Sequence, residues 1–417
     1  MSRFPAILLL VALAALCPNL LRAQDAEEAD IFDSENFTQS VTESLQSEQK
    51  NKLEYLIGGV FLADNTLATT ASFDGYTASG AFLGKVFVRL SVPRYGSLYL
   101  GYILQHAIYQ GQGGSFTFPI TAQDLFTNTF TLSEFYLSFD LAKVLFFRAG
   151  NQLIAWGPSI IWTPVDFINL QRINPLASVD LRVGKPALRV HLPRKDSNLF
   201  LFTDFSSTVT DTGSGLVVND LWKTTNFGLR GDLTVLGFEF GLTGYLGYSI
   251  QNRYGFDFSG RVLATDVYGE LALYFPYGGY EFSYIYSLGF QRTLGELKKW
   301  TLQGEFFFNS TGARDESGYA ALIATQRFVP LYVGQMYAYL GLSKQDLIGT
   351  FLDATLYGVV NISDLSYTMS LKSTFDITGF IPFSLYLAYN GGGPGKEFTI
   401  LAGDNALSAT LEVRFEF

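Results

Sequence analysis

The stretch from Leu407 to Phe417, which ends the chain, reads Leu-Ser-Ala-Thr-Leu-Glu-Val-Arg-Phe-Glu-Phe. Apolar residues occupy every second position of this stretch, and polar or charged residues occupy the positions between them. Because successive strand residues point to opposite faces, the stretch would form a strand with one apolar and one charged side. A tilted strand of this length can cross a bilayer. The stretch therefore predicts a membrane-spanning strand; the alternative is an edge strand of a soluble sandwich.

The end of this strand also has a known counterpart. An alternating apolar last strand that ends in a C-terminal Phe resembles the assembly signal of Gram-negative-type outer-membrane β-barrels. The resemblance implies that Phe415 and Phe417 are the assembly signal. It also implies two partners for the chain, the lipid bilayer and the outer-membrane barrel assembly machinery.

The first 23 residues read as a secretory signal peptide. Arg3 supplies a positive charge, residues 6–16 are apolar, and Leu21-Arg22-Ala23 offers a cleavage site. An apolar run this short is typical of a signal peptide rather than of a membrane span. Cleavage there would remove Cys17, the only cysteine, so the mature chain would contain no disulfide. A lipoprotein signal ending at Cys17 is the competing interpretation, but the Leu before it fits poorly.

The composition favours a membrane β-structure. Aromatic residues make up 16% of the chain and Gly occurs 41 times. Aromatic residues fit pleated surfaces and form girdles at both rims of membrane barrels. After the signal, no apolar run is long enough for a transmembrane helix. The net charge of −10, or −12 once Arg3 and Arg22 are lost, argues against a nucleic-acid partner.

Residues 24–52 differ from the rest of the chain because they are acidic and contain few large apolar residues. Such a composition is typical of a disordered segment. We expect a short acidic N-terminal tail in the periplasm; the alternative is a segment that folds into a barrel as a plug. The predicted organisation is thus a signal peptide (1–23), a tail or plug (24–52) and an outer-membrane β-barrel (53–417).

From Leu53 onward the chain is a succession of strand-like runs separated alternately by short turns and longer polar stretches. This alternation is typical of an all-β, transmembrane, up-and-down antiparallel β-barrel. An odd number of runs implies that one is missed or wrongly assigned, so we predict 16 or 18 strands. The runs are 53–62, 80–91, 97–109, 130–141, 143–156, 184–193, 197–206, 223–234, 236–249, 264–275, 279–291, 299–309, 331–341, 349–361, 365–376, 382–390 and 407–417.

Between residues 157 and 183 the chain reads least like a barrel strand. Trp156-Gly157-Pro158 should end the preceding strand, because Pro cannot donate to a ladder. A connection this long is usually functional or folded inward. The pattern Gly150-x-Gln-x-x-x-Trp-Gly, then Thr163-Pro-x-Asp-x-x-Asn, then Asn174-Pro resembles a segment of poorly characterised porin-like outer-membrane proteins. It covers about residues 148–193, and Asn151 stands where such barrels usually carry Arg.

Charged and polar residues around this connection are candidates for the lumen. We expect a basic strip that faces acidic residues including Asp140, because charged lumen residues set selectivity in pores. The alternative is that Trp156, Asp166 and Asn169 only fix the loop through caps and turns. The candidate lumen or constriction residues are Glu134, Arg148, Gln152, Trp156, Asp166, Arg172, Asp180, Arg182, Arg189 and His191.

Signals for catalysis and metal binding are weak. The chain has only two histidines, His106 and His191, and no Gly-x-Ser-x-Gly elbow. No Cys, His or Asp cluster has metal-ligand spacing. Residues 390–397 superficially resemble a phosphate-binding loop but lack its first Gly and its Ser or Thr, so we interpret them as a flexible turn with no helix after it. No enzyme activity, cofactor or metal site is predicted.

The sequence therefore favours a porin-like channel in the cell outer membrane for passive or facilitated passage of small solutes. The alternative is a surface adhesin or a structural outer-membrane barrel, which would need long external loops or a closed lumen. A membrane-embedded hydrolase is disfavoured by the two histidines. The identity of the solute and the oligomeric state stay open.

Overall fold

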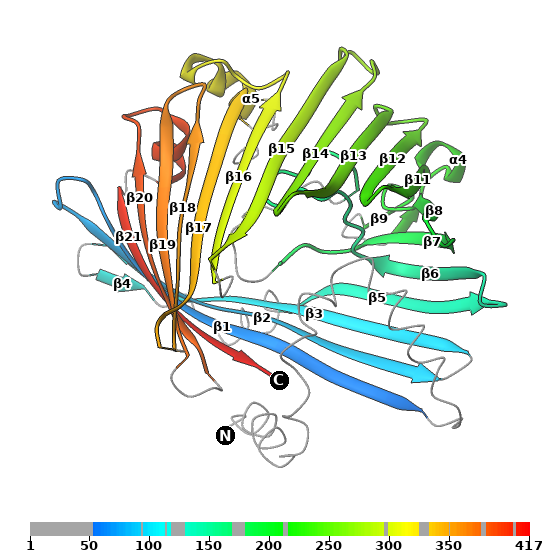
Figure 1. Cartoon of the computed structure of the whole chain (residues 1–417), viewed down its shortest axis with the longest axis horizontal. Coiled ribbons are helices and arrows are strands. Elements are labelled where there is room, and N and C mark those ends of the chain that lie inside the picture. The colour runs from blue at the N-terminus through cyan, green and yellow to red at the C-terminus, as the bar shows by residue number, and fades with distance from the viewer. Residues whose placement is uncertain are drawn as a thin grey trace.

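The computed structural model of the chain describes residues 53–92, 95–112, 115–117, 130–168, 180–211, 216–295, 299–324, 333–349, 351–376, 381–402 and 406–417. The predicted signal peptide and tail lie outside these residues and stay predictions. Within the described residues, 18 antiparallel strands form a closed barrel (Figure 1). The predicted all-β up-and-down barrel is confirmed, with the larger of the two predicted strand numbers.

The wall strands follow one another around the barrel in sequence order. They are β1 (Glu54–Thr69), β2 (Tyr76–Val92), β3 (Gly96–Gln112), β5 (Phe130–Leu141), β6 (Leu145–Gln152), β7 (Lys185–Pro193), β8 (Ser197–Asp204), β11 (Asn226–Val235), β12 (Phe238–Gly247), β13 (Arg253–Val262), β14 (Thr265–Tyr274), β15 (Ser283–Leu294), β16 (Trp300–Asn309), β17 (Met336–Ile348), β18 (Leu352–Asn361), β19 (Ser366–Phe375), β20 (Phe383–Gly391) and β21 (Leu407–Glu416).

The first and last strands close the barrel. β1 pairs antiparallel with β21 from Thr69 opposite Leu407 to Val60 opposite Glu416. Beyond the strand end, the amide N–H of Gly59 donates to the carbonyl of Phe417 at 3.0 Å, and the Phe417 N–H donates back at 3.1 Å. Closure leaves no unpaired sheet edge along this seam, which is what lipid requires of a spanning β-structure.

The strand that the sequence prediction missed is β13. Its outward residues Tyr254 and Phe256 alternate with inward ones such as Asp257, which is 3% exposed. Gly255, Ser259 and Gly260 interrupt the apolar signal, so the stretch reads as a loop between two stronger runs. This strand turns the 17 predicted runs into the 18 strands of the barrel.

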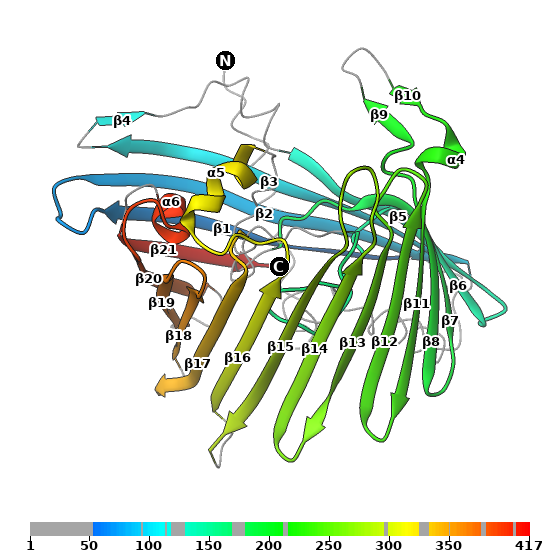
Figure 2. The ribbon, with the colours of Figure 1, turned by 90° about the horizontal axis from the view of Figure 1, so that it is seen from above.

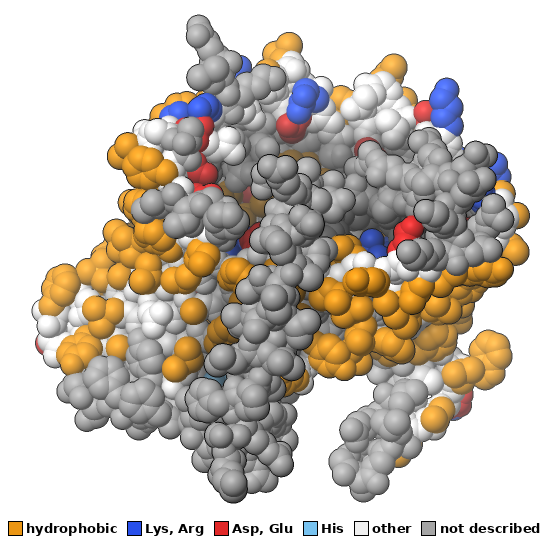
Figure 3. Space-filling model, turned by 90° about the horizontal axis from the view of Figure 1, so that it is seen from below, with side chains coloured by type: hydrophobic (Ala, Val, Ile, Leu, Met, Phe, Trp, Pro, Cys, Tyr) orange, Lys and Arg blue, Asp and Glu red, His pale blue; other side chains and the backbone are white. Residues whose placement is uncertain are grey.

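The two faces of the wall differ in the way that the alternation predicts. Outward residues such as Leu242 and Leu340 are exposed by 64% and 59%, whereas inward Asp257 and Glu305 are almost fully buried. Figure 3 shows hydrophobic side chains spread over the outer wall, with charged side chains seen mainly toward one edge. An exposed apolar surface of this extent marks a membrane-facing wall.

Connections at one end of the barrel are short, and those at the other end are longer; we call these the short-turn end and the long-loop end. At the short-turn end only Leu236 and Gly237 join β11 to β12, both with positive φ (52° and 81°). Two positive φ values match the twist of tight hairpins. At the long-loop end, the longest connection, residues 153–184, joins β6 to β7.

Short elements decorate the long-loop end (Figure 2). No helix of the described residues is long and apolar enough to span a bilayer. The short elements are β4 (Ser115–Thr117), which pairs with β3, the hairpin β9 (Val209–Asp211) and β10 (Leu216–Val218), α4 (Leu221–Thr224), η1 (Glu316–Gly318), α5 (Tyr319–Ala324) and α6 (Glu397–Ala402).

Candidate functional site

The connection between β6 and β7, which we call the inner loop (residues 153–184), packs against the lumen side of the barrel wall. The structure describes its residues 153–168 and 180–184. Trp156 packs edge-on against Phe202 of β8, with ring centroids 4.7 Å apart. Phe167 and Tyr274 of β14 pack edge-on at 6.0 Å, within the same buried cluster. The prediction of an inward-folded loop is therefore confirmed for these residues.

Glu270 of β14 and Glu305 of β16, which we call the acidic wall, bind the main chain of the inner loop. Glu270 accepts hydrogen bonds from the N–H groups of Ser159 and Val165 at 2.8 and 3.0 Å. Glu305 accepts three more, from residues 160, 161 and 162, at 3.0, 3.2 and 2.8 Å. Both carboxylates are at most 4% exposed. Breaking any of these five bonds would leave a buried N–H without a partner, so the acidic wall fixes the loop firmly.

Trp162 anchors the middle of the inner loop and is fully buried. Its ring stacks on Phe307 of β16 at 5.3 Å and lies 5.8 Å from the ring of Tyr337 of β17. Phe398 of α6 belongs to the same buried cluster. A second segment from the long-loop end therefore reaches the same place in the lumen.

The helix α6 contradicts the prediction for residues 390–397. A helix does follow Gly395, and its first residue, Glu397, is completely buried. Glu397 Oε2 accepts hydrogen bonds from the Tyr337 hydroxyl at 2.6 Å and from the Asn361 Nδ2 at 2.8 Å. The expectation of a flexible turn was wrong, because these tertiary contacts hold a short helix that Gly-rich flanking sequence would not form alone.

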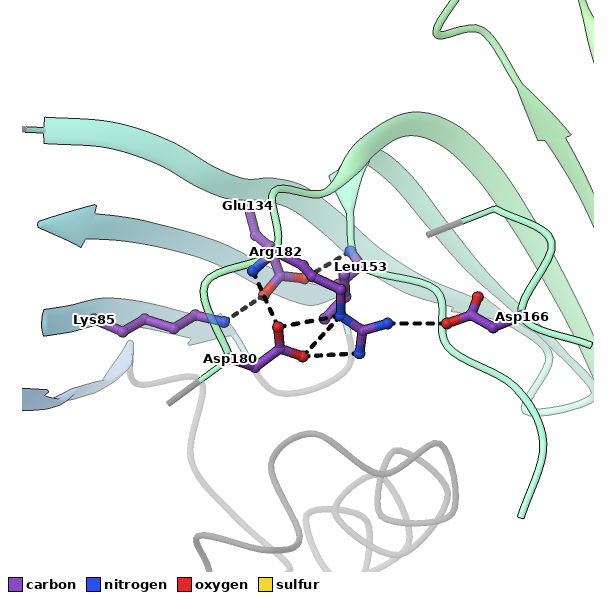
Figure 4. Close-up of polar contacts among 6 residues, drawn as sticks. All are labelled: Lys85, Glu134, Leu153, Asp166, Asp180 and Arg182. Atoms are coloured by element: carbon purple, nitrogen blue, oxygen red, sulfur yellow. Dashed lines mark hydrogen bonds and ion pairs between the residues drawn. The ribbon is translucent and has the colours of Figure 1, made fainter. Parts of the chain in front are cut away.

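The predicted residues Asp166, Asp180 and Arg182 form an ion-pair network at the base of the inner loop (Figure 4). The Arg182 Nη1 donates to Asp166 Oδ2 at 2.9 Å, and its Nε donates to Asp180 Oδ2 at 2.9 Å. Burial alone would lower the pKa of Arg182, but the hydrogen bond and charge of Asp180 raise it above the usual value. This arginine is therefore a structural partner of the two aspartates and stays charged.

Glu134 lies beside this network (Figure 4). It pairs with Lys85 of β2 at 3.5 Å and accepts a hydrogen bond from the N–H of Leu153 at 2.9 Å. Gln152 is fully buried, and its Nε2 donates to the carbonyls of Arg148 and Ala187. Glu134 thus connects the base of the inner loop to β2, and Gln152 joins β6 to β7 directly before the loop begins.

Arg148 of β6 and Arg189 of β7, which we call the arginine wall, are direct cross-strand partners. The guanidinium carbon of Arg148 lies 4.4 Å from the Tyr136 ring centroid, and that of Arg189 lies 4.7 Å from the Phe200 ring centroid. Such cation–π contacts stabilise guanidinium groups without neutralising them. Among the described residues, Arg189 has no salt bridge within 4.0 Å, and its Nη2 has no hydrogen-bond partner.

The remaining predicted residues lie apart from these groups. His191 stacks on Phe200 at 4.2 Å and contacts Asn198 through Nε2 at 3.0 Å. Asp140 accepts the Lys143 N–H in the turn after β5, so it caps a turn at the short-turn end. Asn151 binds the carbonyl of Ser133 through its amide. Arg172 lies outside the described residues, and its role stays a prediction.

Sequence reasoning missed Glu270, Glu305 and Glu397. Each is an isolated acidic residue followed directly by a large apolar residue, at an inward or loop position. A buried carboxylate needs hydrogen-bond donors, so such isolated acids were the available signal. Among the described residues, no group of three or more His, Cys, Asp or Glu side chains is arranged to hold a metal ion.

Comparison with known proteins finds relatives in fold only. No family model and no curated protein matches the chain. The outer-membrane protein OprD of Pseudomonas aeruginosa matches with a TM-score of 0.53 at 8% identity, over 89% of this chain and 96% of that chain. OccK7 (OpdD) of the same organism matches with a TM-score of 0.51 at 7% identity, over 87% and 99% of the two chains.

The chain has the fold of porin-like outer-membrane barrels. At these sequence identities the likeness shows the fold alone and does not indicate a substrate. The predicted resemblance to porin-like outer-membrane proteins is confirmed at this level, and the fold matches the predicted location in the cell outer membrane.

Proposed function

We propose that this protein is an outer-membrane channel for passive or facilitated passage of small solutes. The observation that carries the proposal is an inner loop fixed to one side of the lumen of a closed 18-strand barrel. A barrel of this strand number is too wide for wall side chains to fill, so an inward loop narrows it. Pore width and lumen charge, rather than bond chemistry, would then decide which solutes pass.

The arrangement of charges supports a preference for anions. The carboxylates of the acidic wall accept loop amides, and Asp257 forms an ion pair with Arg230 at 2.7 Å. Asp166 and Asp180 are paired with Arg182. Among the described residues, Arg189 of the arginine wall has no salt bridge within 4.0 Å. The lumen therefore favours anions even though the whole chain carries a net charge of −10, because a pore selects by its lining.

Conductance of the refolded chain in a planar bilayer tests this proposal. We expect stable channels from residues 24–417 and, in a salt gradient, a reversal potential that favours the anion. Residues 53–417 provide the comparison: a larger conductance would mean that the segment 24–52 is a plug. An equal conductance would mean that it is a tail.

The second candidate is a structural barrel or an adhesin. One observation favours it: both the inner loop and α6 contribute to buried clusters on the lumen side and would close the barrel if they fill it completely. Heat-modifiable migration on gels first shows that residues 24–417 and 53–417 are both folded. If neither then forms channels in the bilayer, this candidate is favoured over the channel.

A further inference from the structure

The helix α6 contacts the lumen face of the wall as well as the inner loop. Phe398 is 4% exposed and belongs to a cluster with Tyr339 of β17 and Val359 of β18, which face the lumen. Ile161 and Trp162 of the inner loop belong to the same cluster. Two segments far apart in the sequence thus share one apolar core inside the mouth of the barrel.

Hydrogen bonds fix α6 in this position. The N–H of Glu397 donates to Asp364 Oδ2 at 2.8 Å, and the Phe398 N–H donates to Ser366 Oγ at 3.3 Å. Asp364 also accepts the hydroxyl of Tyr319 at 2.7 Å, which connects α6 to the loop that carries α5. A fully satisfied buried network of this kind holds a segment in one arrangement.

Tyr337 contacts both segments. Its ring packs against Trp162, and its hydroxyl donates to Glu397 Oε2 while accepting the N–H of Gly334 at 2.6 Å. Displacement of α6 would therefore remove a hydrogen-bond partner from the residue on which Trp162 packs. Tyr337 therefore connects the position of α6 to that of Trp162 in the inner loop.

We propose that α6 is the second part of the constriction, and that Glu397, Phe398 and Tyr337 set the solute size limit jointly with the inner loop. This inference rests on the proposed channel function. It assigns to residues 392–402 a part in specificity that the sequence prediction gave to the inner loop and its neighbouring strands. Glu397 and Tyr337 are positioning residues, since they act by holding α6 and Trp162 in place.

Two variants test the proposal by single-channel conductance in planar bilayers. Glu397→Ala removes the oxygen that accepts the hydrogen bonds of both Tyr337 and Asn361, so it frees α6 from β17 and β18 at this point. Phe398→Ala keeps the hydrogen bonds and removes the Phe398 ring from the cluster that contains Trp162. Each should raise the conductance by at least about 1.5-fold and admit larger polyethylene glycols, because the constriction loosens.

Leu365→Ala is the matched control, because Leu365 is 68% exposed in the turn next to Asp364. It should leave the conductance and the size limit unchanged. Wild-type conductance and size limit in both test variants, with heat-modifiable folding confirmed, would overturn the proposal. Absence of channels in the wild-type protein would instead overturn the channel function itself, so the two failures are distinguishable.

A double-mutant cycle separates coupling from simple widening. Trp162→Ala, Phe398→Ala and the double variant should give changes in the logarithm of conductance that do not add, because both side chains fill one cluster. Additive changes would mean that the two segments act separately and would contradict the joint constriction.

Discussion

The acidic wall and the arginine wall lie in the same barrel and follow the same alternation, yet their charges serve different ends. Glu270 and Glu305 are bound by five backbone N–H groups of the inner loop. Arg148 and Arg189 lie over aromatic rings, and Arg189 has no salt bridge within 4.0 Å among the described residues. Inward charge therefore does not by itself identify a solute-binding surface. The contacts of each inward charge have to be known before a role in solute passage is proposed for it.

The closing seam between β1 and β21 belongs to neither wall. Deletion of Phe417, at this seam, should have the largest effect, because it concerns assembly of the whole barrel. Phe417 pairs with Gly59 through its main chain, and its ring lies 5.7 Å from Phe61. Deletion should lower the level of folded barrel in the outer membrane about tenfold, because it removes the C-terminal Phe of the predicted assembly signal and both main-chain bonds to Gly59.

The heat-modifiable band on gels measures this level. Leu263→Ala, at a turn residue that is 96% exposed, is the control and should leave the level unchanged. A normal band after deletion of Phe417 would contradict the assembly role.

The acidic wall should carry the largest effect on stability. Glu305→Ala leaves three loop N–H groups without their acceptor, which should lower the free energy of unfolding by about 3 kcal/mol or more. Urea unfolding of the refolded barrel measures this change, and conductance should rise in the same variant.

Gln303→Ala on the same strand is the control, because the Gln303 side chain bonds to Gln291 and Tyr339 on neighbouring wall strands. It should cost about 1 kcal/mol. Equal decreases in the free energy of unfolding of the two variants would mean that Glu305 stabilises the loop no more than Gln303 stabilises the wall.

The arginine wall should carry the largest effect on selectivity. Replacing Arg148 and Arg189 together by Ala should shift the permeability ratio toward cations by about threefold, because the two charges face the lumen. Adding Arg182→Ala should extend the shift, since Asp166 and Asp180 then lose their cation.

Reversal potentials in a salt gradient measure these shifts. Arg261→Ala is the control, because Arg261 is exposed and pairs with Asp266. Unchanged reversal potentials in the double variant would remove the distinction between the two walls.

The smallest effect is expected at the base of the inner loop. Arg182→Lys keeps the charge but loses the paired hydrogen bonds to Asp180, which should cost about 1 kcal/mol. The raised pKa of Arg182 means that its contribution is complete below the unfolded pKa and is lost only as pH rises through the still higher folded value.

The stability difference between the wild-type protein and the Arg182→Lys variant should therefore stay constant from about pH 6 to 9. Thermal unfolding at several pH values measures it, with Arg261→Lys as the exposed control. A difference that grows across this range would mean that Arg182 titrates there.

The barrel could be predicted from the sequence because alternation is a local property of each strand. Strand β13 was missed where Gly255 and Gly260 weakened that local signal. The inner loop was predicted from its length and its Trp-Gly-Pro start. What binds it was not predictable, because Glu270 and Glu305 are more than 100 residues away in the sequence.

The candidate lumen residues show the same limit. Their phase placed Arg148 and Arg189 on the inner face, but it did not separate them from Arg182, whose partners lie within the inner loop. The helix α6 was hidden because its stability comes from Tyr337 and Asn361 rather than from its own sequence. Tertiary partners, not local patterns, assign these roles.

The acidic wall accepts hydrogen bonds from main-chain N–H groups, which every residue except proline has. The hydrogen bonds of residues 159–162 to the acidic wall therefore do not depend on which side chains these residues carry. Ile160 is the one of the four whose side chain is not buried, so it is the position where a new side chain disturbs the packing least. Proline is the substitution that would break this attachment, because it has no amide N–H to donate to Glu270 or Glu305.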